Sequence, residues 1–309
     1  MKKIYKIYRY YNYNTKFINI ILLIIFIFSL CILKNKKNKI KICLCVIGKN
    51  ENLYAKEYVN HYKELGYNHI YIYDNNDINS EKISSILKDE INQNFVSIIN
   101  YIGYRGNNNS SQQEAYYDCY KKNKIHYNWI SFFDFDEFLE LKQNRTIQEY
   151  LDNKIFEKCQ NIKINWLIYS SEKELLYYEN KPLQIRFNKP MFNNIANKHI
   201  KSTVRGHMKE NYWSKWATPH SSSNNFISCS SSGKNVDSQS PFIDPPDYEY
   251  AVLKHFSIKS FEEYCNKLKR GWPDSTDSML WINDLMKKNK NNLDKIKILK
   301  KLFNLTDKV

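Results

Sequence analysis

The chain has 309 residues, a formal net charge of +15 and seven cysteines, none of them in a Cys-x-x-Cys pair. The length fits one large domain or two small ones, and the cysteine spacing supports neither a zinc site nor a redox motif. Lysine and asparagine are abundant throughout, so the charge indicates a compositional bias more than a selected binding surface. With seven glycines, the sequence contains no glycine-rich phosphate loop.

Residues 17–33 form an almost unbroken apolar run, near the short limit for a membrane-spanning helix. Lysines follow it without a small-residue cleavage pattern, which favours an uncleaved anchor over a signal peptide. Both the tail 1–16 and the linker 34–40 are basic, so the positive-inside rule gives no orientation. We expect a single-pass membrane protein, of the Golgi or ER type II kind if the source is eukaryotic.

After the linker, buried-strand patterns alternate with helical ones. Gly66 is expected to end the first helix, and Ser111 with Glu114 offers a capping box for the third. Such alternation is typical of a doubly wound, mostly parallel sheet with helices on both faces. The predicted strands are 41–47, 69–73, 95–99 and 129–133, and the predicted helices are 53–65, 81–91 and 111–122.

Beyond residue 141 the pattern favours a mixed β extension. Ser260 and Glu263 predict the capped start of a helix that ends at Gly271. The serine-rich segment 220–246 has few apolar residues to bury, so we expect a mobile loop. The expected catalytic domain is 41–275, followed by helices in 276–309. The predicted strands of the extension are 162–169, 183–187, 199–204 and 250–258.

The most informative stretch follows the strand 129–133, where Asp134 and Asp136 flank Phe135. In extended chain, residues i and i+2 point to the same side, so the two carboxylates would face one point. Carboxyl ends of parallel strands are where open α/β sheets bind ligands. Two carboxylates there suit Mg²⁺ or Mn²⁺, and such an ion suits a diphosphate. A turn or helix cap is the structural alternative.

Several short blocks follow one another along the chain. They are Cys45 to Glu51 with Tyr58, His69 to Asn76, Gln113 to Cys119, Trp129-Ile130, Asp134 to Phe138, Lys201 to Arg205, His220, Leu253 to Phe256, Lys259-Ser260, Glu262-Glu263 and Arg270-Gly271. In these blocks and their order, the sequence resembles glycosyltransferase family 92 and related glycosyltransferase 2-like proteins of the GT-A class, whose metal motif is Asp-x-Asp. The likeness covers most of 41–275. The segment between Arg205 and His220 and the serine-rich loop depart from the family pattern, so the acceptor is the least transferable part.

The resemblance implies a GT-A fold, described as a Rossmann-like, mostly parallel sheet with a mixed β extension. It also implies a metal site with Asp136 as principal ligand and Asp134 on the metal or ribose side. His255 resembles the late histidine that completes such sites. A buried strand histidine without a ligand is the alternative for His255.

Other matched positions imply contacts with the donor. Glu51 and Asp74 end the first two strands, where a nucleobase and ribose would lie, although both could be turn residues. Lys201 and Arg205 are candidates for holding phosphate oxygens, against the alternative of a solvated strand edge. His220 is expected to contact donor or acceptor if it has a role.

The family implies inversion, which needs a carboxylate base near the acceptor hydroxyl. Glu137 and Asp274 are the leading candidates and Glu262 is a third; the sequence does not choose among them. Acceptor sugars often stack on tryptophan, although tryptophan is more commonly a core residue. The candidate tryptophans are Trp166, Trp213 and Trp216.

We therefore expect a metal-dependent glycosyltransferase that moves a sugar from a nucleotide-diphosphate donor, a UDP-hexose in the first place, to a hydroxyl of a glycan or glycoconjugate. A metal-dependent nucleotidyl- or phosphotransferase would use the same carboxylates. A basic nucleic-acid-binding protein and a non-catalytic lectin-like relative are alternatives of other classes. The sequence has no RNA- or DNA-binding motif, so no nucleic-acid partner is expected.

Overall fold

The computed structural model describes residues 40–102, 110–171, 173–178, 181–208, 218–222, 226–270 and 278–305, without the side chains of 278–281. The proposed anchor, residues 17–33, lies outside these ranges. Within them, no helix is both long and apolar enough to cross a bilayer.

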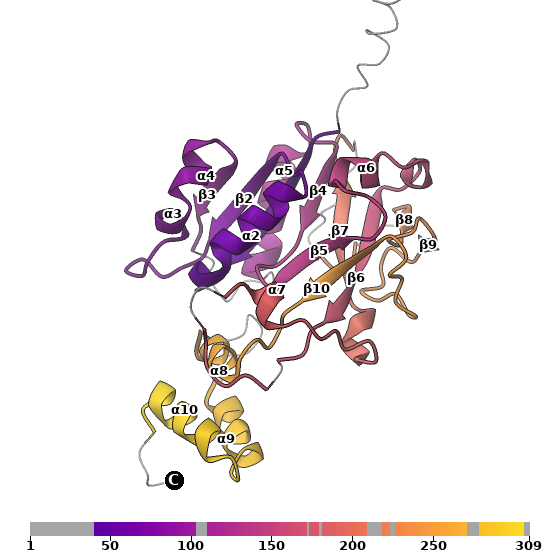
Figure 1. Ribbon diagram of the computed structural model, residues 1–309. Coiled ribbons are helices and arrows are strands. Elements are labelled where there is room, and N and C mark those ends of the chain that lie inside the picture. The colour runs from indigo at the N-terminus through magenta and orange to yellow at the C-terminus, as the bar shows by residue number, and fades with distance from the viewer. Residues whose placement is uncertain are drawn as a thin grey trace, which may run out of the picture. The chain divides into compact units, whose positions relative to one another are not determined.

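The described elements run in the order shown in Figure 1. The strands are β1 (Ile42–Gly48), β2 (His69–Asp74), β3 (Val96–Asn100), β4 (Trp129–Phe132), β5 (Glu137–Leu141), β6 (Asn161–Ile168), β7 (Ile200–Arg205), β8 (Ser228–Cys229), β9 (Asn235–Val236) and β10 (Ala251–His255). The helices are α2 (Asn52–Glu64), α3 (Ile83–Ile86), α4 (Lys88–Asn92), α5 (Ser111–Asn123), α6 (Ile147–Leu151), α7 (Leu183–Arg186), α8 (Phe261–Arg270), α9 (Ser278–Lys288) and α10 (Leu293–Phe303), with short 3₁₀ turns η1 (Lys154–Phe156) and η2 (Ile195–Lys198).

The strands form one sheet in the order β3-β2-β1-β4-β7-β6-β10-β5, and β8 and β9 extend it beside β6. The first four strands are parallel, as the alternating sequence pattern predicts. Strand β7 pairs antiparallel with β4 and β6, and β5 pairs antiparallel with β10. The fold is therefore α/β with a parallel half and a mixed extension, as expected.

Strand β1 carries apolar side chains on both faces because a helix covers each face. Ile42, Leu44 and Val46 pack in the cluster that includes the α2 face, whereas Cys43 and Cys45 pack in the cluster that includes α5. This alternation places the two helices on opposite sides of the sheet, as Figure 1 shows. Cys43 and Cys45 are both fully buried.

The route from β4 to β5 requires the sheet to curl. These strands are four positions apart in the sheet, which would be about 19 Å in a flat sheet. Only four residues separate Phe132 from Glu137, and an extended chain covers about 17 Å over those five steps. Tyr58 and Tyr62 of α2 donate their hydroxyls to Phe133 O and Glu137 O and hold the returning chain against the helix. The acidic turn 134–136 is thereby enclosed.

Two expected elements are wrong. The expected strand 183–187 is instead the short helix α7 (Leu183–Arg186), because Glu57 accepts the backbone N–H groups of Leu183 and Gln184 at the helix start. The expected helix 81–91 is divided into α3 and α4, because Leu87 leaves helical geometry at φ −109° and ψ 29°.

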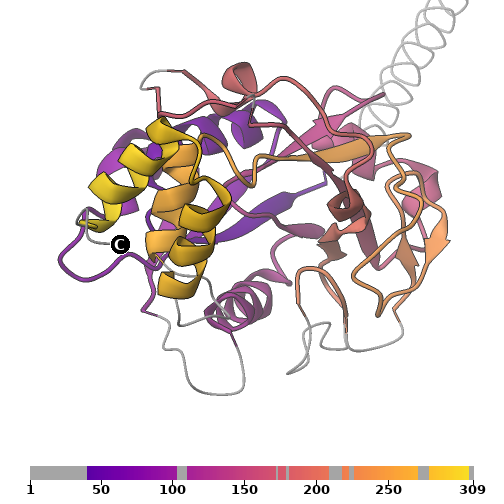
Figure 2. The same cartoon turned by 90° about the horizontal axis from the view of Figure 1, so that it is seen from below.

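The caps of two helices follow the expected chemistry, one of them displaced by a residue. At α5 the capping box joins Ser110 to Gln113, where Ser111 and Glu114 were expected. At α8 the box joins Ser260 and Glu263 as predicted. Gly271, the expected helix end, lies outside the described residues. Helix α8 lies beside α9 and α10 (Figure 2). Apolar side chains of the three helices form a small cluster.

The serine-rich segment is ordered in its described part, contrary to the expected mobile loop. Five of its described serines are buried, and polar groups from the sheet bond part of its backbone. Lys163, itself buried, donates to the carbonyls of Asp237, Ser238 and Ser240. A disulfide between Cys159 and Cys229 fixes β8. Hydrogen bonding and a covalent link therefore supply what apolar burial cannot.

Candidate active site

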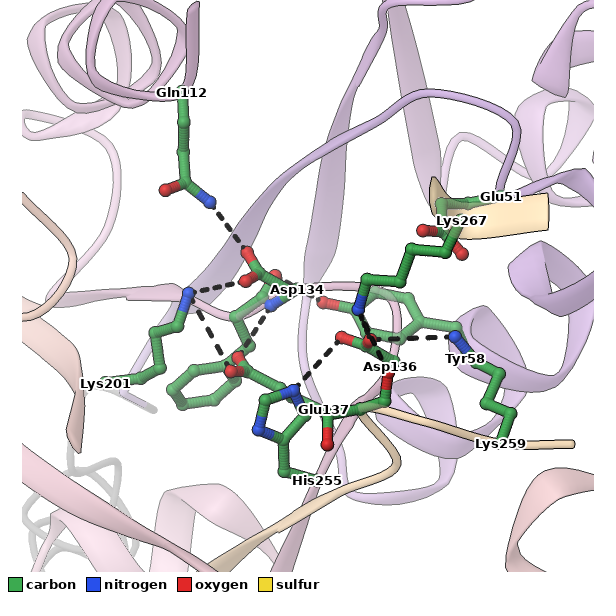
Figure 3. Close-up of polar contacts among 12 residues, drawn as sticks. Glu51, Tyr58, Gln112, Asp134, Asp136, Glu137, Lys201, His255, Lys259 and Lys267 are labelled. Atoms are coloured by element: carbon green, nitrogen blue, oxygen red, sulfur yellow. Dashed lines mark hydrogen bonds and ion pairs between the residues drawn. The ribbon is translucent and has the colours of Figure 1, made fainter. Parts of the chain in front are cut away.

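Asp134 and Asp136 lie in the turn between β4 and β5, at the carboxyl end of the parallel strands (Figure 3). Alternation of side chains sends Phe133 and Phe135 into the core and leaves the two aspartates together. The ring of Phe135 packs so closely on Gly48, at the end of β1, that a Cβ there would lie 2.6 Å from it. Only glycine fits this position without a shift of the turn.

Asp134 is held by a buried lysine. Lys201 of β7, 1% exposed, places its Nζ 2.7 Å from Asp134 Oδ2. Gln112 Nε2 and Tyr116 Oη of α5 donate to Oδ1 at 2.9 and 3.1 Å. Burial raises the pKa of Asp134, but the ammonium of Lys201 outweighs it and leaves this pKa below its ordinary value. Asp134 is therefore an anion at neutral pH.

Asp136 is surrounded by two further lysines. Lys267 of α8 donates to Oδ2 at 2.9 Å, and Lys259 Nζ lies 3.6 Å from the same oxygen. Burial again raises the pKa of Asp136, but Lys267 and Lys259 together bring it well below its ordinary value. Neither lysine was assigned a role from the sequence, because contacts between α8 and the turn are separated by more than a hundred residues.

Two histidines, His255 and His220, lie near the carboxylates. His255 Nε2 is 3.6 Å from Asp136 Oδ1, and burial lowers the pKa of His255 to about 4. His220 Nδ1 bonds Ile200 O at 2.7 Å, and burial lowers its pKa to about 3. Both rings are neutral at pH 7. The ring of Trp166 contacts both, with centroids 4.3 Å from His255 and 5.5 Å from His220.

Glu137 supports the turn from below. Its side chain is fully buried, and Oε2 accepts the backbone N–H of Asp134 at 2.8 Å. Burial raises the pKa of Glu137 well above its ordinary value, although Lys201 opposes the shift. These contacts give Glu137 a structural function and leave no surface through which it could reach an acceptor hydroxyl.

Lys259 and Lys267, which contact Asp136, also line a pocket of about 720 Å³. Glu51, at the end of β1, forms an ion pair there with Arg270 of α8, which also donates to Lys49 O. The lining is strongly charged and includes Lys49, Glu51, Tyr54, Lys259, Lys267 and Arg270.

Two residues predicted to contact the donor, Asp74 and Arg205, do not lie with the residues around the two aspartates. Both oxygens of Asp74 accept backbone N–H groups, from Asn76 and Ile83, so its carboxylate closes the turn after β2. Arg205 lies opposite Trp129 at the other end of β4, bonds the carbonyls of residues 156, 157 and 159, and stacks on the Trp129 ring. Lys201 and Arg205 are four residues apart on one strand, roughly 13 Å, and therefore point to different ends of the sheet.

Asp274, Trp213 and Trp216 lie outside the described residues. The described residues that the structure brings together are Glu51, Asp134, Asp136, Glu137, Lys201, His220 and His255.

The side chains around Asp136 fit a divalent cation in part. Among the described residues no three His, Cys, Asp or Glu side chains form a ready metal cluster. Asp136 Oδ1 and the neutral His255 ring nevertheless face each other, and His255 Nδ1 has no hydrogen-bond partner among these residues. One oxygen and one nitrogen ligand leave room for water and phosphate oxygens, as Mg²⁺ and Mn²⁺ sites on nucleotides commonly do.

A family model described as "Glycosyltransferase family 92" matches residues 38–269. A family 92 protein of Oryza sativa subsp. japonica is 28% identical over 112 residues, 36% of this chain and 18% of the relative. One of Ricinus communis is 25% identical over 114 residues, 37% of this chain and 20% of the relative. The matched segment thus spans about a fifth of each relative.

Solved structures with a similar arrangement include S. aureus TarS, with a TM-score of 0.35 and 11% identity over 86% of this chain and 43% of that one. TarS 1–349 in complex with UDP-GlcNAc gives a TM-score of 0.34 and 13% identity over 86% and 72%.

Proposed function

The chain belongs to glycosyltransferase family 92 and carries that family's domain over residues 38–269; on this premise we propose that it is a glycosyltransferase of the GT-A type. It transfers a sugar from a nucleotide-diphosphate donor to a hydroxyl of a glycan or glycoconjugate. A UDP-hexose is the preferred choice of donor. The observation that supports the proposal most is Asp136, an enclosed carboxylate beside His255 and a charged pocket.

The residues of this site would divide the work of donor binding. Asp136 and His255 would hold Mn²⁺ or Mg²⁺, which when bound stabilises the negative charge that develops on the departing diphosphate. Lys201 fixes Asp134, whose side chain is 31% exposed and would accept a ribose hydroxyl. Glu51 lies at the pocket wall with Arg270, in position for the nucleoside end of the donor.

We propose an inverting transfer, with the base outside the acidic turn. Glu137 is enclosed, so it is not our choice. Glu262 lines the pocket and is our first candidate for the base among the described residues. Asp274, which follows α8 in the sequence, remains the second candidate. Either carboxylate would accept the proton of the acceptor hydroxyl as the sugar is transferred.

The test is release of nucleoside diphosphate by the full chain from a panel of UDP- and GDP-sugars, with Mn²⁺, with Mg²⁺ and with EDTA. We expect turnover of a UDP-hexose that EDTA abolishes. Incubation with nucleoside triphosphates separates this function from a nucleotidyl- or phosphotransferase, which would consume them.

Asp136→Asn should reduce transfer at least about a thousandfold without unfolding the protein, because the neutral amide loses the cation ligand. Asp89→Asn, a surface aspartate 79% exposed on α4, is the matched control and should transfer normally. Full activity of purified Asp136→Asn would exclude the assigned role.

A further inference from the structure

Asp136 receives two ammonium groups while it offers one negative charge. Lys267 and Lys259 approach the same oxygen, Oδ2, from α8 and from the residue just before its cap (Figure 3). Their side chains are only 20% and 4% exposed, respectively. Buried ammonium groups are costly, so their convergence on one oxygen at a pocket wall calls for an explanation.

Lys259 is held there by backbone and ring contacts. It has a left-handed φ of 60°, a conformation that costs a non-glycine residue of order 1 kcal/mol or more. Its Nζ lies 4.3 Å from the ring centroid of Tyr54, a cation–π contact. The chain therefore accepts local strain to fix an ammonium group at the boundary between Asp136 and the pocket.

The same wall holds other cations that are already paired. Lys49 Nζ lies 2.7 Å from Asp77, and Arg270 pairs with Glu51. Lys259 and Lys267 differ because their partner, Asp136, is also the proposed ligand of a divalent cation. A divalent cation on Asp136 would lie beside two positive charges. Their repulsion weakens cation binding unless the ammonium groups turn to another anion.

We propose that Lys259 and Lys267 form the diphosphate site of the pocket and make cation binding at Asp136 depend on the donor. Without a donor, the two ammonium groups hold Asp136 Oδ2 and oppose the cation. When a nucleoside diphosphate enters, they turn to its phosphate oxygens and release that oxygen. By linkage, cation and diphosphate then each raise the affinity for the other. This proposal rests on the proposed function and adds to it a coupling between cation binding and diphosphate binding.

Isothermal titration of the full chain tests the proposal with four titrations: Mn²⁺ alone, Mn²⁺ with saturating UDP, UDP alone, and UDP with saturating Mn²⁺. In the unmodified protein, UDP should raise the affinity for Mn²⁺ at least about tenfold. In Lys267→Met, Mn²⁺ alone should bind at least about tenfold more tightly, because a like charge is gone. UDP in the presence of Mn²⁺ should bind about tenfold to a hundredfold more weakly, because a charge-assisted hydrogen bond is lost.

Two variants control for charge and folding. Lys122→Met removes the same charge from α5, where Lys122 is 65% exposed and does not line the pocket, so both affinities should stay within about twofold. Lys267→Arg keeps the charge and should restore UDP binding. Thermal melting verifies the fold, and Lys259→Met replaces Lys267→Met if the latter unfolds.

The proposal requires Lys267→Met to change the two affinities in opposite directions, with tighter binding of Mn²⁺ and weaker binding of UDP. Affinities that both fall, or that both stay unchanged, in a folded Lys267→Met protein would overturn the proposal. So would equal Mn²⁺ affinities with and without UDP in the unmodified protein. Failure of the proposed function would appear differently, as no turnover of any nucleotide sugar by the unmodified chain.

Discussion

Asp134 and Asp136 lie two residues apart, yet their surroundings prepare them for different tasks. Asp134 has one ammonium below it and keeps 31% of its side chain exposed, whereas Asp136 is 7% exposed. An exposed, charged carboxylate suits a hydroxyl of the donor. An enclosed one that already attracts cations suits an ion and its counter-charges. In the proposed function, Asp134 is therefore the ligand for sugar or ribose and Asp136 the ligand for the metal.

His220 should make stability depend on pH at the site. Burial lowers its pKa to about 3, against about 6.5 in an unfolded chain. Between those values the unfolded state binds more protons, so the free energy of unfolding falls as pH falls. From pH 7 to pH 5 this histidine should cost roughly 2 kcal/mol. In His220→Gln, chemical denaturation at the two pH values should show that much less difference.

The matched control is His126→Gln, since His126 is exposed after α5. Its pH dependence should equal that of the unmodified protein. An unchanged pH dependence in His220→Gln would show that the histidine is protonated equally in both states.

At the scale of elements, α8 presents Lys267 and Arg270 to the site, and a buried ion cluster fixes the start of this helix. Arg186 of α7, 1% exposed, binds both Glu263 and Glu174. Tyr54 Oη donates to Glu263 at 2.7 Å. The expected strand at 183–187 is a helix instead, and its last residue supplies this anchor. The position of Lys267 and Arg270 in the pocket thus depends on α7.

Arg186→Met should lower the free energy of unfolding by about 3–5 kcal/mol, because Glu263 stays buried without its guanidinium. It should also weaken UDP binding, since α8 is no longer held in place. Urea denaturation and titration with UDP measure the two effects.

A double-mutant cycle with Glu263→Met provides the control. The double variant should be less destabilised than the sum of the two single ones, because neither charge is then left buried alone. Additive losses would show that the ion pair does not couple these residues.

How far the sequence predicts an element depends on how local its signals are. Strands β1 to β4 and helices α2 and α5 are predicted within a few residues, because apolar periodicity and caps lie inside each segment. The segment 183–187 alternates like a strand, but Glu57 on another helix determines its conformation. Strand β5 escapes detection because its partner, β10, lies more than a hundred residues later.

The same distinction applies to the site. The aspartates are recognisable because the motif is contiguous and follows a core strand. Lys259 and Lys267 are not, since a lysine near either end of a helix usually faces solvent, and only the curl of the sheet brings α8 to the turn. Arg205 shows the opposite error: it shares a strand with Lys201, but strand length carries it away from the site.

At the scale of the whole domain, two disulfides tie segments that the sequence could not pair. Cys45 of β1 joins Cys119 of α5, and Cys159 joins Cys229 of β8. The sequence left the pairing open because seven cysteines allow many combinations. The first bond secures α5, which supplies Gln112 to Asp134; the second secures the serine-rich segment, remote from the aspartates in the sequence.

Removing each disulfide should therefore affect stability and activity differently. The bonds close 74 and 70 residues, so each should contribute roughly 4 kcal/mol by chain entropy. Cys45→Ala/Cys119→Ala should lower both the melting temperature and transfer, because α5 loosens beside Asp134. Cys159→Ala/Cys229→Ala should lower the melting temperature by a similar amount while kcat of the folded enzyme changes less. Melting and initial-rate measurements on both variants, after peptide mapping of the bonds, test this; equal losses of kcat would mean that α5 does not position Asp134 through its disulfide.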